Sequence, residues 1–195
     1  MNVGAFITAA GLSSRINEFK PPLTTGIVPA AKRIIQTFRD AGIADIVVVT
    51  GNNAAKLESC LNHLALIFLL NRKYKQTEMF DSVKIALEYM KDNYQKIVFT
   101  PVDVPFFTAE TVMALVKNDA QVTIPVYNNK KGHPIALEGS AAAQILNYHG
   151  SGGLRGAITN LSLGVDCVDV NDSCIIYDMD TQDDYKEIIV MYNSN

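Results

Sequence analysis

The stretch VGAFITAAGLSSR, residues 3–15, joins a run of apolar residues to a loop of small, hydroxyl-bearing and basic residues. Residues 3–8 have the length and composition of a β-strand that is buried on both faces. The following segment, residues 10–26, is polar, contains glycine and proline, and is far longer than an ordinary strand-to-helix connection. Long loops of this kind often carry function, so the stretch predicts a buried first strand with a ligand-binding loop behind it.

Short β-rich runs and longer helical patterns alternate along the rest of the chain. This alternation predicts an α/β domain with a three-layer α/β/α architecture and a mostly parallel sheet. We expect strands at residues 3–8, 45–50, 65–70, 96–100, 121–125, 165–170 and 175–177. We expect helices at residues 29–41, 54–61, 79–90, 108–117, 140–148, 154–161 and 183–191. No repeat or linker divides the sequence, so residues 1–195 are expected to form a single domain.

The composition excludes several classes of protein. Hydrophobic residues make up 48% of the 195 residues and charged residues 19%, which excludes a disordered or coiled-coil chain. Seventeen basic and twenty acidic side chains give a formal charge of -3, so we expect no nucleic-acid or membrane partner. The three cysteines lack C-x-x-C spacing, which predicts neither a disulfide framework nor a structural zinc site. Without a long apolar run or a charged leader, a cytoplasmic location is expected, whereas the oligomeric state is not predicted.

Two common phosphate-binding motifs are absent from the sequence. The P-loop requires a Gly-Lys pair, and the chain contains none. The dinucleotide-binding pattern G-x-G-x-x-G also fails, because Arg155 stands where the last glycine after Gly150 and Gly152 should be. The sequence therefore predicts neither a P-loop NTPase nor a Rossmann dehydrogenase.

Ligands of open α/β sheets bind at the carboxyl ends of the strands, so the loops after residues 3–8 and 96–100 are the candidate site. Gly11 would let backbone N–H groups approach phosphate oxygens, and Arg15 and Lys20 would neutralise phosphate charge. Asp103, just beyond the expected strand at 96–100, is either a Mg²⁺ ligand or a turn cap. The alternative for the first loop is a surface loop with solvated cations.

The motifs of these loops resemble those of the MobA-like NTP transferases, in particular the cytidylyltransferase branch. The resemblance begins with AAGLSSR at residues 9–15 and FKP at residues 19–21, which are similar to that family's nucleotide-binding loop. Later motifs occur in the same order along nearly the whole chain: TEMFDSVK at 77–84, TPVDVP at 100–105, GHP at 132–134, GGLRG at 152–156 and YDMDT at 177–181. Such an ordered series is far more specific than any one motif.

The resemblance implies a Mg²⁺-dependent nucleotidyltransferase of Rossmann-like fold. An acceptor phosphate would attack the α-phosphate of an NTP, with CTP as first choice and GTP as second, and expel pyrophosphate. Arg15, Lys20 and Asp103 would be the catalytic residues, and a small phosphorylated acceptor such as molybdopterin would be the second substrate. The nucleotide would be bound by Ala10, Gly11, Leu12, Ser13, Asn52, Thr77 and Ser82.

Four further residues are candidates for the metal and the acceptor. Asp178 and Asp180 alternate in an extended segment, so both carboxylates can face one ion, although Asp180 can equally cap the last helix. His133 is placed to hydrogen-bond the phosphate or the ring of the acceptor, or is a structural histidine. Arg155, among glycines, is a candidate for the acceptor's phosphate.

The sequence departs from the family pattern at three places. Ile16-Asn17 follows Arg15 where Met-Gly is common, and Glu78 stands where glycine is usual. LTTG at residues 23–26 replaces the leucine-proline-leucine-glycine pattern that is usual there. A carboxylate beside a triphosphate would repel it unless it faces solvent or pairs with a cation. The departures leave two alternatives open: a transferase acting on sugar or alcohol phosphates, and a catalytically inactive nucleotide-binding regulatory module.

Overall fold

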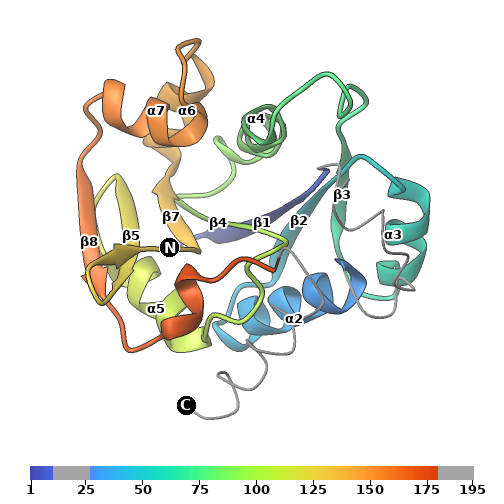
Figure 1. Cartoon of the computed structure of the whole chain (residues 1–195), viewed down its shortest axis with the longest axis horizontal. Coiled ribbons are helices and arrows are strands. Elements are labelled where there is room, and N and C mark those ends of the chain that lie inside the picture. The colour runs from blue at the N-terminus through green and yellow to red at the C-terminus, as the bar shows by residue number, and fades with distance from the viewer. Residues whose placement is uncertain (11–26, 180–195) are drawn as a thin grey trace.

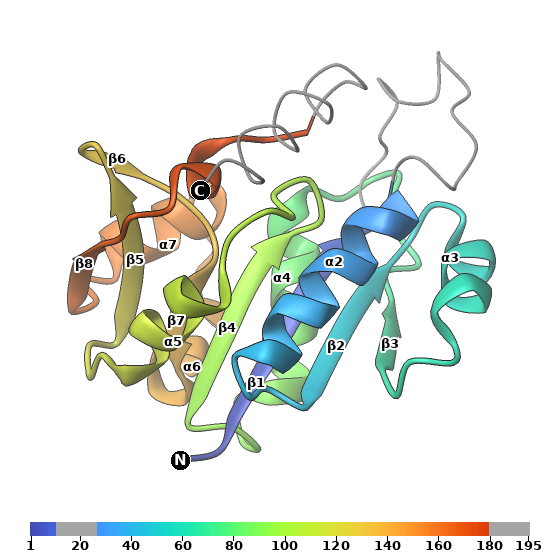
Figure 2. The same ribbon diagram turned by 90° about the horizontal axis from the view of Figure 1, so that it is seen from below.

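The computed structural model describes residues 1–10 and 27–179. These residues form a mixed β-sheet with helices on both faces (Figure 1, Figure 2). The strand order is β3-β2-β1-β4-β7-β5-β6, and β8 pairs with β5. The strands are β1 (Val3–Ala9), β2 (Asp45–Thr50), β3 (Ile67–Leu70), β4 (Lys96–Pro101), β5 (Val122–Tyr127), β6 (Lys130–Lys131), β7 (Ile135–Glu138) and β8 (Val165–Asp169). β3, β2, β1 and β4 are parallel, whereas β7 is antiparallel to both β4 and β5. The predicted α/β class is confirmed, with a parallel core and an antiparallel extension.

The two faces of the sheet are covered by separate hydrophobic clusters. α2 (Ile27–Asp40), α3 (Ala54–Leu61) and α5 (Ala109–Lys117) cover one face, and α4 (Met79–Met90), α6 (Gly139–Leu146) and α7 (Gly153–Asn160) cover the other. β1 serves both, since Ala5 and Ile7 pack into the first cluster and Phe6 into the second. Phe6 stacks on Phe99 of β4 with ring centroids 4.7 Å apart. Burial of one such ring stabilises the fold by roughly 2–3 kcal/mol.

Most predicted elements are present, with small shifts at their ends. Helices 54–61 and 79–90 have the predicted bounds, and Thr108 caps α5 by accepting the Thr111 N–H at 3.2 Å. α2 begins at Ile27 rather than at Pro29, because a proline fits the first helical turn, where backbone N–H groups lack helical partners. The predicted helix 183–191 lies outside the described residues.

Two parts of the secondary-structure prediction are wrong. Residues 135–138, between Pro134 and Gly139, form β7, which the sequence analysis did not predict. The expected strand at 175–177 is instead a 3-10 turn, Ser173–Ile176, because Cys174 and Ile175 pack into the core clusters without a strand partner. β7 is the strand that joins the parallel core to β5, so its omission hid the mixed character of the sheet.

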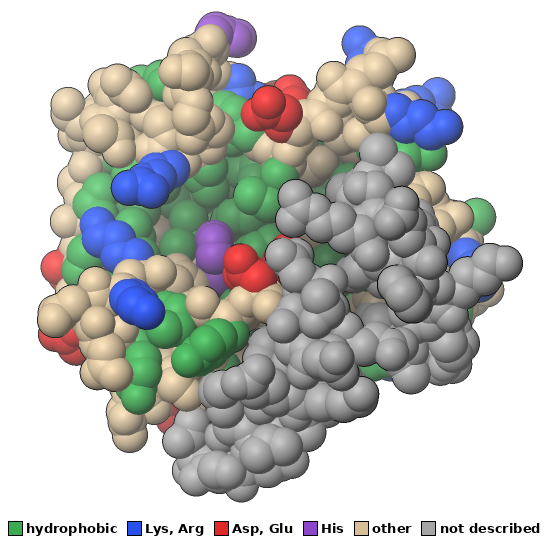
Figure 3. Space-filling view, viewed as in Figure 1, with side chains coloured by type: hydrophobic (Ala, Val, Ile, Leu, Met, Phe, Trp, Pro, Cys, Tyr) green, Lys and Arg blue, Asp and Glu red, His purple; other side chains and the backbone are tan. Residues whose placement is uncertain are grey.

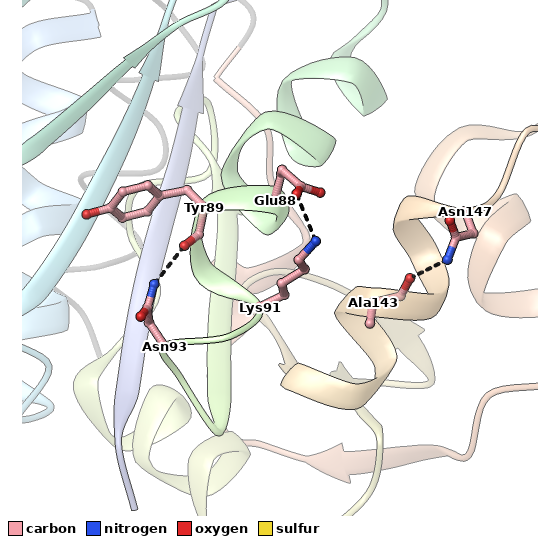
Figure 4. Close-up of polar contacts among 6 residues, drawn as sticks. All are labelled: Glu88, Tyr89, Lys91, Asn93, Ala143 and Asn147. Atoms are coloured by element: carbon pink, nitrogen blue, oxygen red, sulfur yellow. Dashed lines mark hydrogen bonds and ion pairs between the residues drawn. The ribbon is translucent and has the colours of Figure 1, made fainter.

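Side chains complete the carboxyl ends of α4 and α6 (Figure 4). Asn93 donates to the Tyr89 carbonyl at 3.0 Å, and Asn147 donates to the Ala143 carbonyl at 3.1 Å. These bonds satisfy carbonyls that have no partner within the helix. Within the described ranges, no helix is long and apolar enough to cross a membrane.

Candidate active site

The carboxyl ends of β1 and β4 meet at the middle of the sheet. Thr8 lies opposite Pro101 in the register, and the Val102 N–H donates to the Thr8 carbonyl at 3.1 Å. The Val104 N–H then donates to the Pro101 carbonyl at 3.3 Å, closing a turn that places Asp103 just beyond β4. Ala10, which follows β1, is buried at the same edge. Two predicted site residues, Ala10 and Asp103, therefore lie on neighbouring strand ends.

The surface over this edge is hollowed. Figure 3 shows an apolar floor in the hollow, with a histidine and an acidic side chain within it. Basic side chains lie along the side of the hollow that belongs to the antiparallel half of the sheet. This distribution suits a ligand that carries negative charge at one end and an uncharged group at the other.

The end of β2 approaches β1 so closely that only glycine fits. A Cβ on Gly51 would lie 2.7 Å from the Ala10 carbonyl oxygen and 2.9 Å from the Cβ of Tyr74. Asn52, predicted to bind nucleotide, follows in the turn and is partly exposed at this edge. Asn53 adopts a left-handed conformation, φ 55°, at the start of α3.

A buried asparagine that the sequence analysis missed organises the connection from β3 to α4. The Asn71 side chain donates to Thr77 Oγ1 at 3.0 Å and to Ser82 Oγ at 3.1 Å, and it accepts the Lys73 N–H at 3.0 Å. Its own N–H donates to the Thr50 carbonyl at 2.8 Å. Thr77 and Ser82, both predicted to bind nucleotide, are thus brought together as members of one internal network. The sequence does carry one signal that could have identified Asn71, because it is a polar residue directly after an expected strand.

Glu78 is the N-cap residue of α4. Its backbone N–H donates to the Asp81 carboxylate at 2.9 Å, one half of a capping box. Carboxylates at a helix N-terminus are stabilised by the positive end of the helix dipole. The departure from glycine at this position therefore has a structural explanation in α4 itself.

The segment before residue 180 returns to the turn that carries Asp103. The Met179 N–H donates to the Asp103 carbonyl at 2.8 Å, so Asp178 arrives next to this turn, as a shared metal site requires. Within residues 1–10 and 27–179, no three acidic, histidine or cysteine side chains form a metal-binding group. Mg²⁺ commonly uses only one or two carboxylates together with waters and substrate phosphates, so this donor set fits the ion.

His133 lies two residues before β7 and packs edge-on against Phe99, with ring centroids 5.4 Å apart. Its backbone N–H donates to the Ile175 carbonyl at 2.9 Å. Burial lowers the pKa of the imidazole to about 4, so the ring is neutral at pH 7. A neutral ring is a poor partner for a phosphate, which argues against one of the two roles expected from the sequence.

Arg155 is exposed on α7, whose first turn packs against α4. A Cβ on Gly153 would lie 3.6 Å from the Cβ of Phe80. The Lys84 ammonium donates to the Tyr148 carbonyl and lies 4.9 Å from the centre of the Phe80 ring. α4 therefore supports α7, the helix that carries Arg155.

The remaining predicted site residues lie outside the described residues: Gly11, Leu12, Ser13, Arg15, Lys20 and Asp180. Their roles stay predictions.

Comparison with known proteins gives one family and one fold. Residues 5–165 match the model of the MobA-like NTP transferase domain. The molybdenum cofactor cytidylyltransferase of Escherichia coli K12 is 27% identical over 190 residues, covering 94% of this chain and 93% of that protein. The bifunctional protein GlmU of Pseudoalteromonas atlantica is 30% identical over 132 residues, or 66% of this chain. That of Acetivibrio thermocellus is 24% identical over 178 residues, or 86% of this chain. The chain spans only 28% and 38% of the lengths of these two GlmU proteins.

Solved structures with similar folds include other nucleotidyltransferases. A nucleotidyl transferase from Methanothermobacter thermautotrophicus superimposes with a TM-score of 0.79 at 17% identity, covering 100% of this chain and 99% of that one. Rv0371c from Mycobacterium tuberculosis, in complex with manganese, superimposes with a TM-score of 0.73 at 18% identity, covering 97% and 98% of the two chains. At these identities the likeness establishes the fold.

Proposed function

Because the chain belongs to the MobA-like NTP transferase family, a family of nucleotidyltransferase enzymes, we propose that it transfers CMP from Mg²⁺-bound CTP to a phosphate-bearing acceptor. Molybdopterin is the first candidate for the acceptor, since the E. coli relative that matches over its full length is a molybdenum cofactor cytidylyltransferase. GTP is the second candidate for the donor.

The observation that carries the proposal is the central position of Asp103. The predicted nucleotide-binding residues Ala10, Asn52, Thr77 and Ser82 belong to the β1-β2-β3 side of the sheet, whereas His133 belongs to the β7 side. β4, which carries Asp103 at its end, lies between these two sides. A metal held there would touch the phosphates of both substrates.

The chemistry requires positioning and charge neutralisation rather than covalent catalysis. An oxygen of the acceptor phosphate supplies the electron pair that forms a new P–O bond at the α-phosphorus. The bond from the α-phosphorus to the oxygen bridging to the β-phosphorus breaks, and that oxygen leaves with its electron pair on pyrophosphate. Mg²⁺, when bound, neutralises phosphate charge and aligns the two substrates.

The residues of this chain share the remaining tasks. Asp103 and Asp178 would hold the metal, with Asp180 as a further ligand, and the closure between Met179 and Asp103 keeps the two segments together. Arg15 and Lys20 would stabilise the negative charge that develops on the phosphates. Arg155, exposed on α7, would hold the acceptor's phosphate. The network around Asn71 would maintain the conformation of the nucleotide-binding side.

Two alternatives remain as outcomes of a test. The acceptor is a sugar or alcohol phosphate in the first. In the second, the chain binds nucleotide without turnover, for which Glu78 and Ile16-Asn17 are the motivation.

Pyrophosphate release tests the proposal. CTP, GTP, ATP and UTP are each supplied with Mg²⁺ and with molybdopterin, glucose 1-phosphate or glycerol 3-phosphate. We expect release with CTP and molybdopterin, and a loss of at least about 100-fold in Asp103→Asn. Asp119→Asn is the matched control, because Asp119 is exposed at the opposite edge of the sheet, between α5 and β5. Tight binding of one NTP without release would favour the regulatory module, and no NTP binding at millimolar concentration would overturn the proposal.

A further inference from the structure

Asp172 is a buried acidic residue outside the proposed metal and substrate sites, and it is only 3% exposed. Its Oδ2 accepts the Thr108 N–H and the Thr111 hydroxyl, both at 2.8 Å. Its Oδ1 accepts the Cys174 N–H at 3.2 Å. A carboxylate is costly to bury unless hydrogen bonds replace its water, and these three donors meet that requirement. The side chain therefore joins two segments that are far apart in the sequence.

The bonds tie the start of α5 to the 3-10 turn Ser173–Ile176. Thr108 is the N-cap residue of α5, and Asp172 is the N-cap residue of the 3-10 turn. The carboxylate lies at the amino end of α5, where the helix dipole stabilises a negative charge. Hydrogen bonds to a charged group are stronger than bonds between neutral groups, so this attachment is a firm one.

The 172–179 segment is attached again at its far end. The Met179 N–H donates to the Asp103 carbonyl at 2.8 Å, and between the two ends the Ile175 carbonyl accepts the His133 N–H at 2.9 Å. In Figures 1 and 2 the segment runs, in orange to red, from the end of β8 toward the turn beyond β4. Its course is therefore set by α5 at one end and by the Asp103 turn at the other.

Both ends of the segment attach to the connection between β4 and α5. Asp103 lies near the start of this connection, and Thr108 lies at its end. Val104, Phe106 and Phe107, between them, are buried. The connection is thus packed into the protein, and a segment bonded to it at two points has a defined position.

The attachment at Met179 also sets the direction of Asp178. The Met179 side chain is buried in a small cluster with Phe106 and Cys174. The backbone is extended at Tyr177, and adjacent side chains of an extended segment point to opposite sides. Asp178 accordingly is exposed. Its carboxylate is held beside the turn beyond β4 and faces solvent, as a ligand shared with a substrate-bound metal requires.

We propose that Asp172 is a positioning residue for the metal site, which holds Asp178 beside the Asp103 turn by anchoring the 172–179 segment to the start of α5. This inference rests on the proposed function and adds to it a residue that touches neither metal nor substrate. A metal ligand must be held within about 0.5 Å of its working position, so a loosened segment weakens the site. Loss of the anchor leaves the backbone bonds at Ile175 and Met179, so we expect weaker metal binding rather than none.

Lys96, at the other end of α5, provides a matched control. It is also 3% exposed, and its ammonium donates to the carbonyls of Asn118 and Ala120 at 2.8 and 3.1 Å. Asn118 is the C-cap residue of α5, so a buried charged side chain is bonded at each end of this helix. Lys96→Met removes the charge at the end that lies away from the Asp103 turn. It should damage α5 comparably without releasing the 172–179 segment.

The first measurement is hydrogen exchange in the metal-free protein labelled with ¹⁵N-methionine. The Met179 signal is assigned from Met179→Leu, and Met90, buried in α4 on the other face of the sheet, is the internal reference. In Asp172→Asn, where an NH₂ group replaces one acceptor oxygen, the Met179 N–H should exchange at least about tenfold faster, with Met90 nearly unchanged. In Lys96→Met the two rates should keep their ratio. Equal acceleration of Met179 and Met90 in Asp172→Asn, or none at Met179, would overturn the proposal.

The second measurement is the binding of Mn²⁺ alone, followed by electron paramagnetic resonance. We expect the Kd for Mn²⁺ to rise about tenfold in Asp172→Asn and to stay unchanged in Lys96→Met. The Mg²⁺ concentration for half-maximal pyrophosphate release should rise by a similar factor, with kcat at saturating Mg²⁺ retained. A purely structural role would affect both variants alike. The same Mn²⁺ affinity in Asp172→Asn as in the unmodified protein would overturn the proposal.

Thr111→Val covers the case in which Asp172→Asn does not fold. Valine keeps the shape of the buried threonine and removes one of the three bonds to Asp172. The Met179 N–H should then exchange about two- to threefold faster, with Met90 unchanged. An unchanged Met179 rate in this variant would count against the anchor.

The two hypotheses fail in different measurements. Absence of Mn²⁺ binding and of pyrophosphate release in the unmodified protein counts against the transferase activity. The exchange of Met179 needs neither metal nor turnover, so it decides whether Asp172 holds the segment in either case.

Discussion

Two connections, one between β3 and α4 and one between β6 and β7, differ in whether their polar side chains have hydrogen-bond partners. Between β3 and α4, the Asn71 side chain bonds to Thr77, Ser82 and the Lys73 N–H, so the polar groups satisfy one another. Between β6 and β7, the backbone N–H groups of Gly132 and His133 are bonded, whereas the buried His133 Nδ1 has no hydrogen-bond partner. The polar side chains of the first connection satisfy one another, and the second connection leaves one side-chain nitrogen unsatisfied.

Acid should affect the second connection most. The pKa of His133 is about 4 in the folded state and 6.5 in the unfolded state, so between these values the unfolded chain binds the extra proton. The contribution of His133 to stability is complete above pH 6.5 and is lost as the pH falls toward 4, by up to about 3 kcal/mol. Urea unfolding of the unmodified protein and of His133→Phe between pH 4 and 7 measures it. A variant with the same pH slope as the unmodified protein would contradict the assignment.

Asn71→Ala should break the first connection. The truncation leaves the hydroxyls of Thr77 and Ser82 and the Lys73 N–H without their partner, at a cost of about 2–3 kcal/mol in the free energy of unfolding. NTP affinity should fall as well, with acceptor affinity retained. Asn147→Ala, which removes one exposed bond to the Ala143 carbonyl, should cost well under 1 kcal/mol. Equal losses in the two variants would refute the network's role.

Two glycine substitutions, one on each side of the sheet, should affect the binding of different substrates. Gly51→Ala places a Cβ 2.7 Å from the Ala10 carbonyl oxygen, and Gly132→Ala places one 2.2 Å from that of Ile175. Each should destabilise the protein by about 2 kcal/mol, the first weakening NTP binding and the second weakening acceptor binding. Binding titrations and steady-state kinetics distinguish them. Gly164→Ala is the control, because its Cβ would meet only the flexible Gln121 side chain at 3.4 Å.

The smallest expected effect is also the most unusual. Thr8→Val removes a buried hydroxyl that has no partner, so stability should be unchanged or higher by about 1 kcal/mol. Thr123→Val, equally buried, loses a bond to Asn118 Oδ1 at 3.3 Å and should cost about 1 kcal/mol. Thermal unfolding compares the two. A destabilised Thr8→Val would show that its hydroxyl has a structural partner after all.

The sequence was sufficient for the fold where periodicity is strong. The helical patterns at 54–61 and 79–90 gave the bounds of α3 and α4 because their apolar faces are regular. β7 was missed because four residues between a proline and a glycine carry too little periodicity. The apolar run at 175–177 suggested a strand, but a short buried run does not distinguish a strand from a 3-10 turn.

The candidate site was predictable only in its residue types. Asp103 follows a buried strand, and that order is visible in the sequence. The joining of Asn71 to Thr77 and Ser82 depends on how the loop folds back, and no spacing rule encodes it. The unpartnered nitrogen of His133 is invisible for the same reason, since it is defined by what does not surround it.

The bond between Met179 and Asp103 has a consequence for biosynthesis. The chain leaves the ribosome from its amino end at about 5–20 residues per second, and the parallel strands and Asp103 emerge well before Asp178. The bond to the Asp103 carbonyl can form only after β8 and the 3-10 turn have been translated. The turn beyond β4 therefore emerges without the segment that later pairs with it, and that contact is among the late steps of folding.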